Sequence, residues 1–191
     1  MKYTLSFRVW HWLNAIVVLG LLGTVFLRKT FLSYKTNAEI LSTKLADMNV
    51  TISTDNAKIL AKTIRDPMWE WHIILGYALA FFVLYRIFLY FTDKSQKEDF
   101  ASLSLHKKAV KILYYIFYAT LFFMAASGLI IHFHELLGIS KTLAHDIKEL
   151  HESAYNIILA FVVLHIGGVV VAEVRDEHGL VSTMINGRKA E

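Results

Sequence analysis

Residues 151–168 read HESAYNIILAFVVLHIGG, an apolar run with one histidine at its start and another near its end. His151 and His165 are 14 residues apart. This is close to four helical turns, so both imidazoles leave a helix on nearly the same face, about 21 Å apart along the axis. Because an ionisable side chain inside an apolar span is costly and usually functional, the pattern predicts two ligand sites at different membrane depths.

The composition of the whole chain indicates a membrane protein. Its 191 residues are 55% hydrophobic, with a mean hydropathy of +0.45 and a single proline. We therefore predict an all-α integral membrane protein with one domain over residues 1–191. The absence of cysteine excludes disulfides, iron–sulfur clusters, thiolate zinc sites and covalently attached haem. The net charge of +4 fits lipid headgroups better than nucleic acid.

Four apolar runs are long enough to cross a bilayer, and they predict a transmembrane four-helix bundle. The expected spans are residues 7–27, 69–91, 109–131 and 154–172. The first run begins like a signal peptide, but its length and the lack of a small-residue cleavage site predict an uncleaved span. Ser140 is expected to begin a helix that continues into the fourth span.

The connection between the first two spans, residues 28–66, is expected to form a helical outer loop. Thr36 to Glu39 fits a capping box, and Ser53 or Thr54 is a suitable cap for a second short helix. Asp66-Pro67 is expected to end that helix. A small cover on the end of the bundle and a docking surface for a partner remain alternative roles for this loop.

An even number of spans places both termini on the same side of the membrane. Eleven of the twenty Lys and Arg residues fall on that side, including those of the middle loop. The positive-inside rule then predicts that both termini are cytoplasmic.

In this topology the four histidines of the spans form two pairs at matching depths. His11 and His165 lie toward the cytoplasmic end, and His72 and His151 lie toward the outer end. Haem is the planar cofactor that two histidines suit, because two neutral imidazoles fill both axial positions of the iron. No site then remains for oxygen, so the pairs predict two haem b groups that carry out one-electron transfer.

Small residues on the histidine faces agree with a large flat ligand. Ala15, Gly76 and Gly168 follow His11, His72 and His165 by four, four and three residues, offsets that keep them on the same helix face. Close helix–helix contact is the alternative explanation for the glycines.

Four features carry a resemblance to a known family: RVWHWLNA at residues 8–15, HIILG at residues 72–76 with Arg86, the spacing of His151 and His165, and the tail over residues 175–189. Together they resemble the bacterial cytochrome b561 family, which includes the b-type cytochrome subunits of nickel–iron hydrogenases. The resemblance implies a dihaem cytochrome in the bacterial inner membrane that exchanges electrons with quinone. It also implies that His11, His72, His151 and His165 are the axial ligands.

Several polar residues near the predicted haems have candidate roles. His106, with Asn14 and Glu173, is a candidate for binding a quinone head-group by hydrogen bonds or proton transfer. Arg8 and Arg86 are candidates for pairing with haem propionates. The alternatives are an interfacial histidine bonded to water or lipid, and arginines that reach lipid headgroups.

A further group, His132, His134 and His145, has metal-ligand residue types but no recognised spacing. Solvated loop histidines are the preferred interpretation. These histidines and the long first outer loop are the features that do not match the family pattern.

The leading hypothesis is electron transfer between a periplasmic redox partner and the quinone pool. The partner is expected to be a redox subunit or a c-type cytochrome, and a homodimer is left open. A stand-alone superoxide:quinone oxidoreductase is the alternative, for which Arg28, Lys29 and Lys35 provide basic charge at the outer face. A histidine-lined metal transporter is a further alternative.

Overall fold

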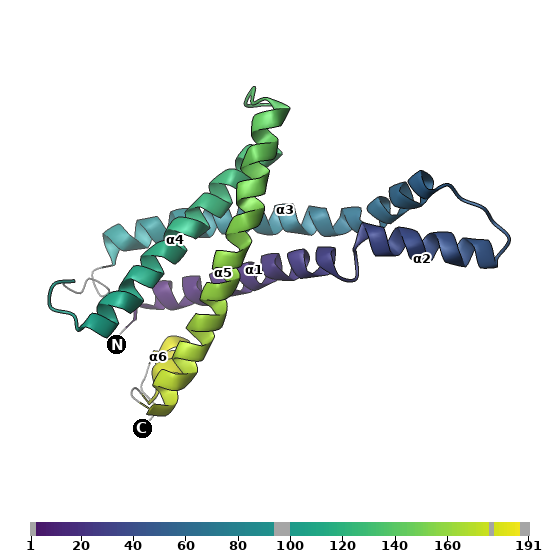
Figure 1. Cartoon of the computed structure of the whole chain (residues 1–191). Helices are drawn as coiled ribbons and strands as arrows, with labels where there is room; N and C mark the ends of the chain where they lie inside the picture. Colours follow the sequence, from purple (N-terminus) through teal and green to yellow (C-terminus); the bar gives the residue numbers. More distant parts are fainter. Residues whose placement is uncertain (1–2, 94–99, 176–177, 188–191) are drawn as a thin grey trace. The chain divides into compact units, whose positions relative to one another are not determined.

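The computed structural model describes residues 3–93, 100–175 and 178–187, and within these ranges the regular structure is entirely helical (Figure 1). Four of the helices, α1, α3, α4 and α5, are long and apolar enough to cross a membrane. They contain the four expected spans, so the prediction of an all-helical membrane protein is confirmed. The helices are α1 (Leu5–Lys29), α2 (Tyr34–Asp47), α3 (Thr54–Thr92), α4 (Leu105–His132), α5 (Lys141–Arg175) and α6 (Leu180–Asn186).

Serine side chains begin two of the helices where the sequence predicted. The Ser53 hydroxyl accepts a hydrogen bond from the Asn56 backbone N–H at 3.2 Å, at the start of α3. The Ser140 hydroxyl accepts one from the Leu143 N–H, also at 3.2 Å, at the start of α5. Each bond satisfies a backbone donor that has no partner within the helix.

The predicted capping box at Thr36 to Glu39 is wrong. Helix α2 begins at Tyr34, two residues before that box, and its N-cap residue is Ser33. The Thr36 hydroxyl, in the first turn, donates to the Ser33 hydroxyl at 3.2 Å. Both registers place a serine or threonine before an apolar stripe, so the local pattern alone did not distinguish them.

The predicted helix end at Asp66-Pro67 is also wrong, because α3 continues through Pro67. Arg65 and Trp69 lie on either side of the proline, and the guanidinium carbon lies 5.9 Å from the centre of the Trp69 ring. The same guanidinium lies 5.3 Å from the ring of Tyr34 on α2. The contact between Arg65 and Trp69 joins residues i and i+4, so it depends on an unbroken helix. It therefore offsets part of the cost of the proline.

The chain divides into two compact units. The unit Val17–Gly76 contains the end of α1, α2 and the beginning of α3. Its core is small: Ala57 and Ala61 of α3 are fully buried and pack with Ala38 of α2. Alanine at these positions allows the two helix backbones to approach closely. Three partly buried residues, Tyr34, Leu41 and Ile52, surround this core.

The other unit comprises Met1–Ile16 and Tyr77–Glu191. Phe7, Trp10 and Leu89 form its buried apolar cluster, which joins α1 to α3. The Trp10 indole N–H donates to the Phe82 carbonyl at 2.9 Å. Within this unit α4 and α5 pack against each other, and α6 contacts α5 (Figure 1).

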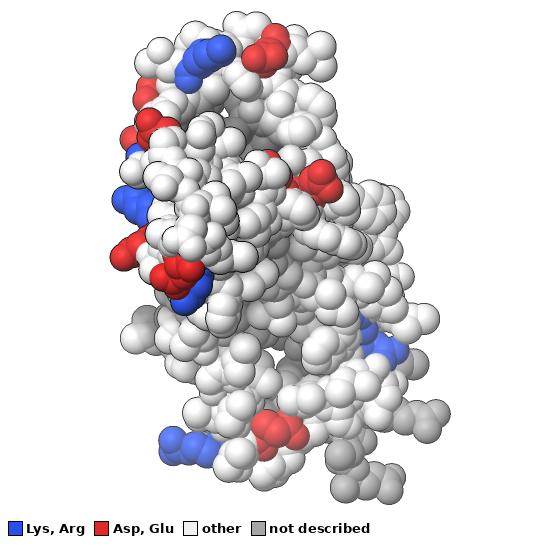
Figure 2. Space-filling view, turned by 90° about the vertical axis from the view of Figure 1, so that its right-hand side faces the viewer, with Lys and Arg blue, Asp and Glu red and all other residues white. Residues whose placement is uncertain are grey.

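The four long helices expose many large apolar side chains. Ile16 of α1, Leu84 of α3 and Val163 of α5 are each more than 60% exposed. Figure 2 shows broad areas of one face without Lys, Arg, Asp or Glu. A surface of this kind suits contact with lipid, which agrees with the spans inferred from length and hydropathy.

Candidate functional site

The structure brings together the first predicted histidine pair. His11 on α1 and His165 on α5 belong to the same unit, and their ring centroids are 6.0 Å apart with an angle of 63° between the planes. An imidazole nitrogen binds a metal ion at about 2.0–2.1 Å, so two rings on opposite sides of one ion have centroids about 6 Å apart. The observed separation therefore fits two axial ligands of one iron.

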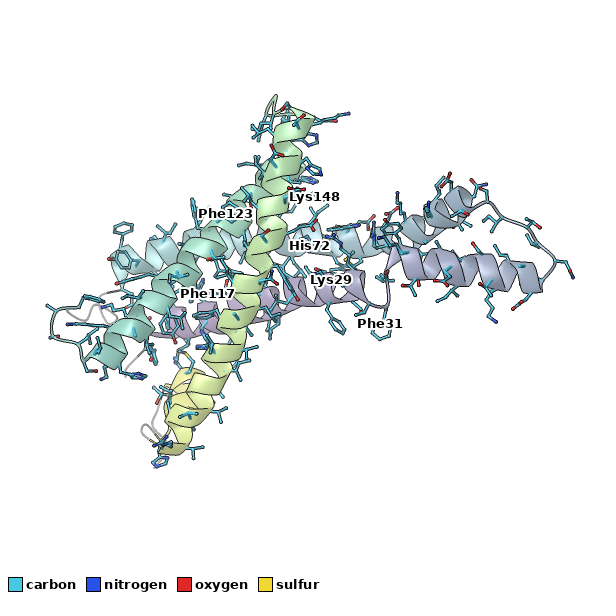
Figure 3. The ribbon with its side chains drawn as sticks, viewed as in Figure 1. Lys29, Phe31, His72, Phe117, Phe123 and Lys148 are labelled. Carbon is cyan, nitrogen blue, oxygen red and sulfur yellow. The ribbon has the colours of Figure 1, made fainter. Side chains whose placement is uncertain are left out.

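Side chains of α4 and α5 hold the His165 ring. The Tyr114 hydroxyl on α4 lies 3.2 Å from His165 Nδ1. Phe161, one turn before His165, stacks on the imidazole with centroids 5.6 Å apart and 8° between the planes. Phe117, labelled on α4 in Figure 3, stacks in turn on Phe161 at 3.7 Å. The helix packing and a hydrogen bond thus both orient this imidazole.

His151 is held by a different pair of residues at the contact between α4 and α5. The Ser127 hydroxyl lies 2.8 Å from His151 Nδ1. The next residue, Gly128, has no side chain, so its backbone lies beside the His151 ring. A Cβ at this position would lie 3.5 Å from His151 Cε1. Ser127 is only 2% exposed, so this contact is sealed within the unit.

His72, labelled on α3 in Figure 3, has a corresponding partner on α1. The Thr24 hydroxyl lies 2.7 Å from His72 Nδ1, and both residues belong to the unit Val17–Gly76. Trp69, almost one turn before His72, meets the imidazole edge-on with centroids 5.5 Å apart. The hydrogen bond to Thr24 and the contact with Trp69 together fix the position and the orientation of the His72 imidazole.

The three hydroxyl partners, Thr24, Tyr114 and Ser127, were not predicted from the sequence. A signal was present, because Thr24 lies three residues before the end of the first expected span and His72 three residues after the start of the second. Antiparallel neighbours therefore place them at similar depth. Small polar side chains in apolar spans commonly form hydrogen bonds between helices.

Two of the glycines predicted to leave room for a flat ligand lie beside open space. Among the described residues, no heavy atom within 4 Å would meet a Cβ on Gly76 or Gly168, apart from the neighbouring backbone. Gly23 and Gly167, for which no ligand role was predicted, have the same open surroundings, so the role of Gly76 and Gly168 beside a flat ligand stays a prediction.

The two arginines predicted to bind propionates are held within one unit. Arg8 donates from Nη1 to the Ile185 carbonyl of α6 at 2.9 Å. The Arg86 guanidinium carbon lies 5.4 Å from the centre of the Trp10 ring and 5.0 Å from that of Tyr118. In the part of the chain that the structure describes, the buried Nε atoms of Arg8 and Arg86 have no hydrogen-bond partner. Both guanidinium groups therefore retain a donor for an anionic group.

The predicted quinone-binding candidates have three different surroundings. Asn14 is buried, and its Oδ1 has no hydrogen-bond partner among the described residues. His106 is exposed in the first turn of α4. The Glu173 carboxylate instead accepts hydrogen bonds from the backbone N–H groups of Gly179 at 2.8 Å and Val181 at 2.9 Å. Glu173 thus caps the start of α6.

The remaining histidines have separate local contacts. The His132 ring meets Tyr77 edge-on at 5.8 Å, and His134 Nδ1 lies 3.0 Å from the Ile131 carbonyl. His145 Nδ1 lies 3.8 Å from the Glu149 carboxylate, one turn along α5. Within residues 3–93, 100–175 and 178–187, no three His, Asp or Glu side chains converge in a way that suits a metal ion.

Comparison with known proteins identifies the family. The family model described as prokaryotic cytochrome b561 matches residues 2–187, almost the whole chain. No curated protein and no solved structure matches the chain. Of the tail residues that contribute to the resemblance, Asp176, Arg188 and Lys189 lie outside the described ranges. The match over almost the whole chain, together with the four apolar helices, shows that the chain belongs to the prokaryotic cytochrome b561 family, whose members are haem-binding b-type cytochromes of membranes that transfer electrons.

Proposed function

We propose that the protein is a dihaem cytochrome in which His11 and His165 bind one haem b, and His72 and His151 bind the other. The observation that carries this proposal is the 6.0 Å separation of the His11 and His165 ring centroids. For the second pair, support comes from the hydrogen bond at Nδ1 of each histidine. Such a bond to the second ring nitrogen is the usual environment of a metal-ligating histidine.

Each bound haem would supply one-electron chemistry, and the residues of this chain would hold and orient it. Four imidazoles would occupy the axial positions, which excludes oxygen binding at the iron. Arg8 and Arg86 would pair with propionates, supported by the unpartnered buried Nε atom of each. Charge-assisted bonds of this kind are strong where water is excluded.

We infer that the protein exchanges electrons with quinone. Asn14 lies three residues after His11, so it shares a helix face with that ligand, and its buried Oδ1 has no partner among the described residues. His106 and Glu173 complete the candidate set. Glu173 is the weaker member, because its carboxylate already binds two backbone N–H groups of the α6 segment.

We propose that the protein lies in the bacterial inner membrane with both termini in the cytoplasm, as the distribution of Lys and Arg predicts. Electrons would then pass between a periplasmic redox subunit or c-type cytochrome and the quinone pool. The outer segment, α2 with the beginning of α3, supplies a surface on which that partner could dock.

The direct test is spectroscopy of the purified protein in detergent. We expect two haem b per chain by pyridine haemochrome assay, and reduction of both haems by added quinol. A colourless preparation from haem-sufficient cells would disprove the proposal. Stopped-flow measurement of superoxide decay with quinone tests the alternative enzyme, for which Arg28, Lys29 and Lys35 were the sequence support. Bound zinc or copper without haem would indicate a transporter.

A further inference from the structure

Thr24 and Ser127 each form a second hydrogen bond, to a carbonyl of their own helix. This bond determines how each hydroxyl interacts with its histidine. The Thr24 hydroxyl donates to the Leu21 carbonyl of its own helix at 2.6 Å. The Ser127 hydroxyl donates to the Phe123 carbonyl, also at 2.6 Å. A hydroxyl has one proton, and a carbonyl oxygen can only accept. The proton of each hydroxyl is therefore already used within the helix.

The position of the proton on each imidazole follows from these bonds within the helices. Because the hydroxyl oxygen has only its lone pairs left, Nδ1 of His72 and of His151 must be the donor. In a neutral imidazole with a proton on Nδ1, the other nitrogen, Nε2, carries a lone pair and is the atom that can bind a metal. The two hydroxyls therefore select the tautomer that an axial ligand needs.

We propose that Thr24 and Ser127 are positioning residues that hold His72 and His151 as Nε2 ligands and tune the iron that those histidines bind. This inference rests on the proposed function. A hydrogen bond donated from Nδ1 makes the imidazole a stronger electron donor, which stabilises the ferric state. Loss of either hydroxyl is expected to weaken haem binding by about 10–100-fold and to raise the reduction potential of that haem.

The same interaction occurs twice, in different units and on different helices. Thr24 on α1 binds His72 on α3, and Ser127 on α4 binds His151 on α5. Hydrogen bonds of a serine or threonine to its own helix or to a neighbouring helix are common in apolar spans. Here the interhelical partner is, at both positions, one of the two histidines proposed for one haem. The two substitutions should therefore affect the same haem.

Thr120 offers a matched control in α4. Its hydroxyl donates to the Ile116 carbonyl at 2.8 Å and it is buried, as Ser127 is, but no contact joins it to a histidine among the described residues. Thr120→Val removes the bond within the helix and nothing else. Thr24→Ser and Ser127→Thr keep the hydroxyl and serve as conservative variants.

The experiment is a redox titration of the haem absorption bands, combined with haem dissociation to an acceptor protein. We expect Thr24→Val and Ser127→Ala each to raise the potential and speed the dissociation of one and the same haem, with Thr120→Val and the conservative variants close to wild type. Unchanged potentials and dissociation rates in both hydroxyl-free variants, in a protein that binds two haems, would overturn the inference but not the proposed function.

Loss of the haem in a hydroxyl-free variant is also informative. Restoration of haem binding by Thr24→Ser or Ser127→Thr then supports the positioning role, and failure of both conservative variants to restore it overturns that role. A wild-type protein without haem would disprove the proposed function itself.

Discussion

The Ser127 hydroxyl lies 2.8 Å from Nδ1 of His151, and this bond joins the last turns of α4 to the first third of α5. The neighbouring Gly128 has no side chain, so the α4 backbone itself lies beside the imidazole. A hydroxyl and a bare backbone position thus shape the surroundings of one predicted ligand. The packing of the two helices and the orientation of the ligand are therefore coupled.

Gly128 provides a graded test of this coupling. A Cβ there would lie 3.5 Å from His151 Cε1, an ordinary contact, so Gly128→Ala should retain the haem content of wild type. Gly128→Leu should displace the imidazole and lower haem content toward one per chain. Pyridine haemochrome assay measures both, and equal haem content in the two variants would contradict the placement of Gly128.

Each proposed axial ligand can be removed singly. His11→Ala, His72→Ala, His151→Ala and His165→Ala should each retain about one haem of two, because the remaining imidazole of a pair leaves one axial position of the iron empty. His145→Ala, at an exposed position on α5, is the control and should keep both haems. A variant with an unchanged reduced spectrum would exclude that residue as a ligand.

The hydrogen bond from Trp10 to Phe82 is expected to contribute to stability. Trp10→Phe keeps most of the ring but leaves the Phe82 carbonyl without this donor, so unfolding should become easier by about 1 kcal/mol. Trp12→Phe is the comparison, because the Trp12 indole donates over a longer 3.3 Å at an exposed site. Thermal unfolding in detergent should rank Trp10→Phe as the less stable of the two.

The contact between α2 and α3 depends on small side chains. Ala61 is 0% exposed and packs beside Ala38, so Ala61→Leu should overpack this cluster and destabilise it by about 1–3 kcal/mol. Thr63→Leu places the same leucine side chain at an exposed position of the same helix, where it should not carry that cost. Limited proteolysis of the α2 segment should be faster in Ala61→Leu alone.

Gly187 can be compared with Gly138, because both have positive φ. Gly187 has φ +80°, and a Cβ there would lie 3.0 Å from the Arg8 guanidinium carbon. Gly138 has φ +67° and open space around it among the described residues. Both alanine variants carry backbone strain of about 1 kcal/mol. Gly187→Ala should lower the unfolding temperature further, and equal temperatures would show that Arg8 adjusts freely.

Much of the fold was predictable because it depends on local chemistry. The apolar runs gave the four long helices, and Ser53 and Ser140 gave two helix starts. Pro67 was misjudged because the sequence pattern was taken to end the helix there, whereas contacts of Arg65 across the proline and with another helix favour the continued helix. The Arg65 guanidinium lies over Trp69 on the far side of the proline and over Tyr34 of another helix.

The histidines of the candidate site were predictable, but their surroundings were not. Spacing and depth singled out His11 and His165, and the structure places their rings close together. The hydroxyl partners depend on how far each helix is rotated toward its neighbour, which a single sequence does not specify. The role of Glu173 in quinone binding stays a prediction, and the cap that its carboxylate forms at the start of α6 was not foreseen from the sequence.

Helix α3 is unbroken for 39 residues, which corresponds to about 58 Å of length, against about 30 Å for the hydrocarbon layer. Its beginning carries Lys58, Lys62 and Arg65, which favour water, so this part projects from the bilayer ahead of the expected span over residues 69–91. A partner that binds the projecting part of α3 therefore contacts the same helix that carries His72. Partner and proposed haem ligand then belong to one helical element, with Pro67 between them.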